Sequence, residues 1–89
     1  MYSVEFTETA IRDMLEMEKS NPQAYNKIEK FITELEEHPY TGTGHPHQLR
    51  YVEGIWSRSI DKKNRLRYTV NDEKVIVCVI SAKGHYDDK

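Results

Sequence analysis

Six consecutive apolar residues, Val75 to Ile80, constrain the fold of this chain more than any other feature of its sequence. The run is rich in β-branched side chains, which favour extended structure, so we expect residues 74–81 to form a strand. A strand that is apolar on both faces is typical of the interior of a sheet. The run therefore predicts a central strand that is covered on at least one face.

Four shorter segments have strand patterns and provide the neighbours that a central strand needs. They are residues 2–6, 48–52, 54–60 and 65–70. Polar turns at residues 61–64 and 71–73 leave only short connections between the last three strands of the chain. Short connections of this kind favour antiparallel pairing.

Two amphipathic helices are predicted after the first strand. Thr7 is a suitable N-cap for a helix that ends near Lys19. Asn21 and Pro22 then interrupt the chain and begin a second helix, with Asn21 as its N-cap. An apolar stripe at helical spacing follows, formed by Ala24, Ile28, Phe31, Ile32 and Leu35. The two helices should form an αα-hairpin with one apolar side.

A segment rich in proline and glycine, residues 38–47, follows the helices. Two prolines and two glycines in ten residues exclude regular secondary structure there. A loop of this length in a small domain usually carries function or moves. The element order is β-α-α-β-β-β-β. The predicted fold class is α+β, with one domain over residues 1–89 and a helical hairpin packed on one face of a twisted, mostly antiparallel sheet.

The strand at residues 65–70 alternates between apolar and polar side chains. Its even-numbered residues are apolar and are expected to face the helices, while Arg65 and Arg67 lie on the opposite face. Two arginines at alternate positions form a positive ridge on that face. In the strand at residues 54–60, the sequence does not decide whether the set that contains Arg58 faces inward.

The net charge of −2 hides an uneven distribution along the 89 residues. Residues 1–40 have four Lys/Arg and nine Asp/Glu, a net charge of −5, whereas residues 41–89 have nine Lys/Arg and six Asp/Glu, a net charge of +3. An acidic half and a basic half in one small domain suggest one solvated face and one face for an anion.

The sequence also excludes several classes of protein. No apolar run approaches the roughly 20 residues of a membrane span, and the first residues lack the pattern of a signal peptide, so we expect a cytoplasmic protein. The single cysteine, Cys78, excludes an internal disulfide and a multi-cysteine zinc site. His45 and His47 lack a third ligand at suitable spacing, so we expect no metal and no cofactor.

Four segments of the second half of the chain form a recognisable series. They are residues 38–50 (HPYTGTGHPHQLR), residues 54–60 (GIWSRSI), residues 64–68 (NRLRY) and the pair His85-Tyr86. In this order and spacing they resemble the YoeB/Txe branch of the RelE/ParE superfamily, the small toxins of type II toxin–antitoxin modules. The resemblance covers nearly all of the chain.

The resemblance implies an activity as well as the fold predicted above. Members of the family are metal-independent endoribonucleases that cleave mRNA in the ribosomal A site and so inhibit translation. The 2′-OH of a nucleotide attacks the adjacent phosphate, and a 2′,3′-cyclic phosphate and a 5′-OH are formed. This reaction needs a base, a cation for the charge that develops on the phosphate, and an acid for the leaving oxygen.

The resemblance further implies roles for individual residues. Arg65 stands at the position of the catalytic arginine, and His85 at that of the general acid. Tyr86 stands at the position of a tyrosine that stacks on a base or orients groups near the phosphate. Arg50 occupies the position of a lysine that neutralises phosphate. A guanidinium stays charged and holds phosphate oxygens in a planar fork, which suits both arginine positions.

Three departures from the family pattern distinguish this chain, one of which is that Asp87-Asp88-Lys89 follow the His-Tyr pair at which the family commonly stops. His47 stands where the family has a glutamate as general base, and we hypothesise that its imidazole takes this role with His85 as the acid. Ser59 replaces a family arginine, which implies either weaker stabilisation of the transition state or compensation by Arg58 or Arg67, and the sequence does not decide between them.

Two alternatives stay open on the sequence alone. One is a protein of this fold that poisons DNA gyrase through protein contacts, and the other is a degenerate toxin that acts as a co-repressor. The resemblance implies a YefM-like antitoxin as partner, with operator DNA bound only through the antitoxin. It also implies contacts of the basic half with 16S rRNA and mRNA that weaken with salt. Toxins of this type can form homodimers, and the sequence does not decide whether this chain does.

Overall fold

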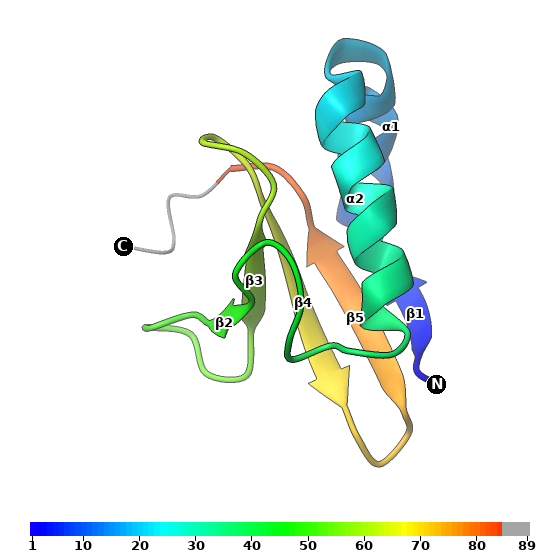
Figure 1. Ribbon diagram of the computed structural model, residues 1–89, viewed down its shortest axis with the longest axis vertical. Coiled ribbons are helices and arrows are strands. Elements are labelled where there is room, and N and C mark those ends of the chain that lie inside the picture. Colours follow the sequence, from blue (N-terminus) through cyan, green and yellow to red (C-terminus); the bar gives the residue numbers. More distant parts are fainter. Residues whose placement is uncertain (85–89) are drawn as a thin grey trace.

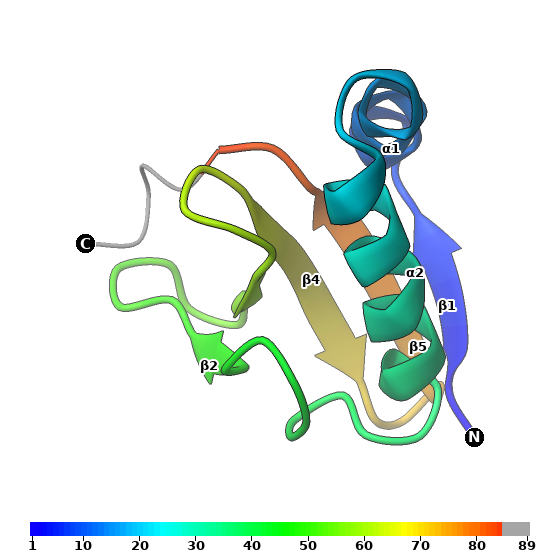
Figure 2. The same cartoon turned by 45° about the horizontal axis from the view of Figure 1, so that its top comes forward.

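The computed structural model describes residues 1–84, which form two helices and five strands. In chain order these are β1 (Ser3–Phe6), α1 (Glu8–Ser20), α2 (Pro22–Leu35), β2 (His47–Gln48), β3 (Trp56–Ser59), β4 (Arg65–Asn71) and β5 (Ile76–Ser81). The strands form one sheet in the order β1-β5-β4-β3-β2, in which β1 is parallel to β5 and the other pairs are antiparallel. Both helices lie on the same side of this sheet, near β1 and β5 (Figures 1 and 2). The predicted α+β class and the helical hairpin on one face are confirmed.

Both helices begin where the sequence indicates. The Thr7 hydroxyl oxygen accepts a hydrogen bond from the Ala10 N–H at 3.0 Å, and the Asn21 side chain accepts one from the Ala24 N–H at 3.3 Å. Pro22 occupies the first turn of α2, where its missing N–H costs no helical hydrogen bond. The two predicted N-caps are confirmed. No helix within residues 1–84 combines the length and apolar character that crossing a bilayer requires.

The core lies between the helices and the sheet. Its buried side chains are Ala10, Met17, Ala24, Ile28, Phe31, Leu35, Ile60, Leu66, Tyr68, Val77, Val79 and Ala82. β5 is flanked by β1 and β4, as predicted for a central strand, and its residues Val77 and Val79 belong to this core. Leu66 and Tyr68 are fully buried, which confirms the inward face predicted for β4.

Three strand predictions are wrong in their extent, and one of them is the strand expected over residues 54–60, which is shortened to β3 (Trp56–Ser59). The strand expected over residues 48–52 is reduced to β2, because the Leu49 N–H donates to the Ile55 carbonyl oxygen at 2.8 Å and closes a short loop. The apolar run enters β5 only at Ile76, since Val75 has a φ of 57° in the turn between β4 and β5. This left-handed conformation is uncommon for a β-branched residue and does not continue a strand.

The loop rich in proline and glycine between α2 and β2 is tied to three parts of the fold. The hydroxyls of Tyr40 and Tyr2 donate to the two carboxylate oxygens of Asp72, at 2.6 Å and 2.5 Å. The hydrogen bond to Asp72 raises the pKa of Tyr40 to about 12. The Tyr40 ring also lies edge-on to Trp56, with ring centres 5.0 Å apart. These contacts join the loop to the N-terminus, to the turn before β5 and to β3.

Candidate active site

Candidate residues on β2, β3 and β4 fall into one row across the sheet. His47 pairs with Ser57, Ser57 with Arg67, and Arg67 with Ser81. Residues opposite each other in neighbouring strands project from the same face, with Cβ atoms about 5 Å apart. The adjacent residue Tyr68 points into the helical core. The row therefore lies on the face of the sheet away from the helices, here called the helix-free face.

Arg65 adds a second guanidinium to the helix-free face. It pairs with Ser59 at the end of β3, and it stands two residues before Arg67 on β4, so the two side chains share a face. Arg65 is half-buried. The imidazole of His47 and the guanidinium of Arg65 on one surface combine a proton acceptor with fixed positive charge, as phosphate chemistry requires.

The imidazole of His47 is oriented by the residue two positions earlier. Its Nδ1 lies 2.9 Å from the carbonyl oxygen of His45, which can only accept a hydrogen bond. In the neutral ring the proton therefore belongs on Nδ1, and Nε2 is left unprotonated. An unprotonated Nε2 can take up a proton, which is the task of a general base.

The last described residues bring the chain next to Arg65. The Arg65 N–H donates to the Gly84 carbonyl oxygen at 3.0 Å, and the Gly84 N–H donates to Asn64 Oδ1 at 3.1 Å. Gly84 is the residue that precedes His85 in the sequence. His85 and Tyr86, predicted as the general acid and as the stacking or orienting tyrosine, lie outside the described residues.

Arg67 holds the end of β5 in place. Its Nη1 donates to Ser81 Oγ at 3.2 Å and to the Lys83 carbonyl oxygen at 3.0 Å. The ammonium group of Lys83 forms an ion pair with Glu16 of α1. Because Arg67 is only 6% exposed, it offers little surface to a phosphate. Its position fits an anchoring role better than the phosphate-binding role predicted for it.

Two other residues of interest lie near the ends of β2 and β3. Arg50 is exposed in the loop between β2 and β3, where its side chain is accessible to a phosphate. Ser59, which replaces a family arginine, is half-buried, and its N–H donates to the Gly44 carbonyl oxygen at 2.7 Å. Within residues 1–84, no three His, Cys, Asp or Glu side chains gather where they could share a metal ion.

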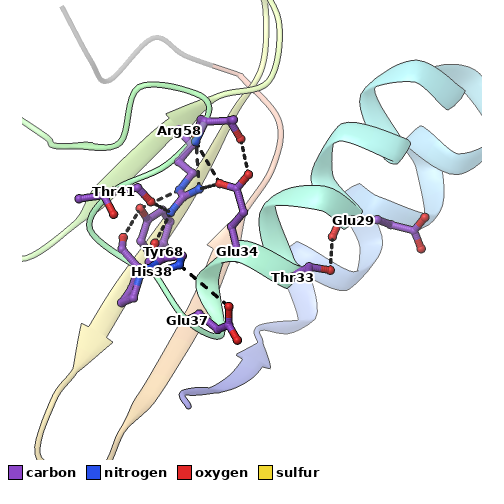
Figure 3. Close-up of polar contacts among 10 residues, drawn as sticks. Glu29, Thr33, Glu34, Glu37, His38, Thr41, Arg58 and Tyr68 are labelled. Carbon is purple, nitrogen blue, oxygen red and sulfur yellow. Dashed lines mark hydrogen bonds and ion pairs between the residues drawn. The ribbon is translucent and has the colours of Figure 1, made fainter.

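Arg58 is not on the helix-free face, and the structure corrects the role expected for it. Its side chain is fully buried on the helical side of the sheet, where Nη1 donates to Glu34 Oε1 at 2.6 Å (Figure 3). Partial burial raises the pKa of the Glu34 carboxyl, but hydrogen bonds from Thr43 and Arg58 outweigh this effect and hold that pKa below its usual value. A guanidinium without exposed surface cannot bind an RNA phosphate.

The partnership of Arg58 with Glu34 was not predicted, although the sequence contains a signal for it. Trp56 and Ile60 flank Arg58 at two-residue spacing, and apolar neighbours at this spacing indicate an inward position on a strand. Glu34 follows Phe31 by three residues, which places it beside the apolar stripe of the second helix. Two opposite charges in inward positions imply a buried pair.

Comparisons with known proteins agree with this fold. Residues 6–86 match the family described as the YoeB-like toxin of bacterial type II toxin-antitoxin systems. The chain is 33% identical over 87 residues to the YoeB toxin of Mycobacterium bovis, which covers 97% of this chain and 100% of the relative. It superimposes on the YoeB dimer of Staphylococcus aureus with a TM-score of 0.84, at 26% identity over 96% of this chain and 98% of that one. The YoeB–YefM complex from the same organism gives a TM-score of 0.81 at 27% identity, over 97% and 99% of the two chains.

The fold and these matches define the protein as the toxin of a type II toxin–antitoxin system. Within that class, the chain belongs to the YoeB toxin family. The resemblance seen in the sequence is confirmed at the level of the family.

Proposed function

We propose that this toxin is a ribosome-dependent endoribonuclease that cleaves mRNA in the A site and inhibits translation in the cytoplasm. One observation carries the proposal. His47 and Arg65 share the helix-free face, and the residue before His85 is hydrogen-bonded to Arg65. Membership of the YoeB family supports a ribonuclease, and this face carries His47 and Arg65, the residues to which we assign the base and the cation of such a reaction.

The proposed reaction assigns one task to each of these groups. Nε2 of His47 removes the proton of the 2′-OH, whose oxygen attacks the adjacent phosphorus. Arg65 stabilises the negative charge that develops on the phosphoryl oxygens. His85 gives its proton to the 5′ oxygen as the phosphorus–oxygen bond breaks, which leaves a 2′,3′-cyclic phosphate and a 5′-OH. Tyr86 stacks on a base or orients groups near the phosphate.

Electrostatics supports an RNA ligand and dependence on the ribosome. The second part of the chain, residues 41–89, has a net charge of +3, and it contains both Arg50 and the helix-free face. A chain of 89 residues has little surface with which to hold a long substrate, so the ribosome positions the mRNA. Binding to 16S rRNA and mRNA should weaken as salt concentration rises.

The partners of relatives suggest the partners of this chain. A YoeB toxin of Staphylococcus aureus has been solved with YefM and as a dimer. We therefore propose a YefM-like antitoxin as the partner, with operator DNA bound only through that antitoxin, and a homodimer for the free toxin. Co-expression with the antitoxin should suppress the growth arrest that the toxin causes alone.

Primer extension on mRNA from translating ribosomes tests the proposed activity. The wild type should produce codon-specific stops and 2′,3′-cyclic phosphate ends, and Arg65→Ala should not. Arg12→Ala is the matched control, because Arg12 is an exposed arginine of α1 that pairs with Glu8 at 3.2 Å. Inhibition of DNA supercoiling without mRNA stops would instead show a gyrase poison. Antitoxin and operator binding without either effect would show a co-repressor.

A further inference from the structure

All five N–H groups of the Arg58 guanidinium have acceptors, and three of these acceptors are backbone carbonyl oxygens of the loop between α2 and β2. The carbonyl oxygens belong to His38, Thr41 and Thr43, at 2.6, 2.9 and 3.3 Å. The other two acceptors are Glu34 Oε1 and the Tyr68 hydroxyl oxygen, at 2.6 and 3.2 Å. Figure 3 shows Arg58 between Glu34, which comes from α2, and the residues of the loop. A single buried side chain therefore fixes the main chain of the loop at three points.

Glu34 and Tyr68 hold the same loop at further points. The Glu34 carboxylate accepts hydrogen bonds from the Thr43 N–H at 3.0 Å and from the Thr43 hydroxyl at 2.8 Å. The Tyr68 hydroxyl donates to the Pro39 carbonyl oxygen at 2.7 Å. We call Glu34, Arg58 and Tyr68 the loop clamp. Most of its bonds reach backbone atoms, so it fixes the path of the loop rather than the positions of particular side chains.

Close packing extends from the loop clamp toward His47. A Cβ atom at Gly42 would lie 2.5 Å from Glu34 Oε1, and one at Gly44 would lie 2.5 Å from Cζ of Phe31. Both glycines also have positive φ values, 125° and 81°. The loop thus lies directly on α2 at these two positions, with no room for a side chain.

The path from the loop clamp to the imidazole is three residues long. The Gly44 carbonyl oxygen accepts the Ser59 N–H at 2.7 Å, which docks the loop on the end of β3. The next residue, His45, has a φ of 54°, and its carbonyl oxygen lies 2.9 Å from Nδ1 of His47. The orientation of the His47 ring therefore depends on the backbone that the loop clamp fixes.

We propose that the loop clamp is a positioning device for His47. It sets the location and the tautomer of the imidazole on the helix-free face, from the opposite side of the sheet. The effect on reaction rate rests on the proposed ribonuclease function, whereas the effect on His47 itself does not. Catalytic groups must be held close to their productive geometry, and a loop with two prolines and two glycines cannot do this without such supports.

Thr43→Val is the variant that tests this role with least risk to folding. Thr43 is exposed, and the substitution removes only the hydroxyl that bonds to Glu34. Thr43→Ser restores that hydroxyl and should rescue the effect. Thr33→Val is the matched control, because the exposed Thr33 hydroxyl bonds to the Glu29 carbonyl oxygen on the surface of α2, away from the loop.

Three measurements are made on each of these three variants. In Thr43→Val, hydrogen exchange at the Thr43 and Ser59 amides should accelerate about fivefold, and the imidazole nitrogen resonances of His47 should shift. The kcat on programmed ribosomes should fall about tenfold while KM changes less than twofold. Thr43→Ser and Thr33→Val should match the wild type in all three readouts. A residue with a purely structural role would lower the melting temperature without moving the His47 resonances.

Each outcome separates this proposal from the proposed function. If the exchange rates and His47 resonances of Thr43→Val equal those of the wild type, the positioning role is refuted, whether or not the protein cleaves RNA. If they change while the wild type cleaves no mRNA, the ribonuclease function fails and the positioning role stands. Tyr68→Phe, which removes the hydroxyl bonded to Pro39, should move the same resonances and gives a second, independent test.

Discussion

The backbone N–H of Arg65 donates a hydrogen bond to the carbonyl oxygen of Gly84 at 3.0 Å. This bond joins the first residue of β4 to the residue that precedes His85. The predicted cation and the chain that leads to the predicted acid are therefore connected through main-chain atoms. Because such a contact does not need the guanidinium, substitutions of the Arg65 side chain test its charge and shape without removing this connection.

Arg65→Ala should lower the rate of mRNA cleavage by about 10²- to 10³-fold, because the charge that develops on the phosphate loses its donor. Arg65→Lys should retain more activity, since it keeps the charge but not the planar fork that matches two phosphate oxygens. Single-turnover cleavage on programmed ribosomes measures both. The control Arg12→Ala should cleave at the wild-type rate. Equal rates for Arg65→Ala and the wild type would remove Arg65 from the mechanism.

His47→Glu should preserve cleavage and displace the acid limb of its pH–rate profile. A carboxylate is a weaker base than an imidazole, so the limb that reports the base should move toward low pH. The rate of cleavage across pH provides the measurement. His38→Gln is the control, because Arg58 uses only the carbonyl oxygen of His38, and the substitution keeps that atom. If His47→Glu and the wild type share one profile, His47 is not the base.

Glu34→Gln should change how stability depends on pH. Partial burial raises the pKa of the Glu34 carboxyl, but the hydrogen bonds from Thr43 and Arg58 outweigh it, so the folded value lies below the reference of 4.5. A carboxyl with a lowered pKa contributes stability above about pH 4.5, and this contribution is lost as the pH falls through the lower folded value. The variant should lose this part of the pH dependence below about pH 4.5.

Urea denaturation between about pH 3 and pH 7 gives the free energy of unfolding that this prediction concerns. At pH 7, Glu34→Gln should be less stable by about 3 kcal/mol, because the buried Arg58 loses its charged partner but keeps its neutral acceptors. Glu29→Gln removes an exposed carboxylate from the same helix and is the control. Curves for Glu34→Gln and the wild type that stay parallel at all pH values would contradict the prediction.

Local signals in the sequence were sufficient for most of the fold. Thr7 and Asn21 cap their helices as predicted, because an N-cap needs only a side-chain oxygen and the residues that follow it. The inward face of β4 could be predicted from the alternation of apolar and polar side chains along the strand. The extent of β2 could not be predicted in this way, because it depends on the loop closed by Leu49 and Ile55. Pairing with another strand is a non-local property.

Some features of the candidate site could likewise be predicted from local patterns, and others could not. The placement of Arg65 on the helix-free face followed from its alternation with Leu66. The burial of Arg58 was not predicted, because charge alone suggested a surface residue and its partner Glu34 lies 24 positions away in the sequence. The anchoring role of Arg67 depends on a β-bulge opposite it that brings Ser81 into register, which no local pattern reveals.

Ser57 and Ser81 occupy the same row of the helix-free face, yet they should respond differently to alanine. Ser57 is fully buried, and its hydroxyl oxygen is a buried side-chain atom for which the structure shows no hydrogen-bond partner. Ser57→Ala removes no hydrogen bond and relieves an unpaired polar group, so stability should stay the same or rise by up to about 1 kcal/mol. Ser81→Ala deprives Arg67 of an acceptor at 3.2 Å and should cost about 1 kcal/mol. Thermal unfolding of both variants measures these changes in stability. A loss of stability in Ser57→Ala comparable to that in Ser81→Ala would show that the Ser57 hydroxyl forms a hydrogen bond.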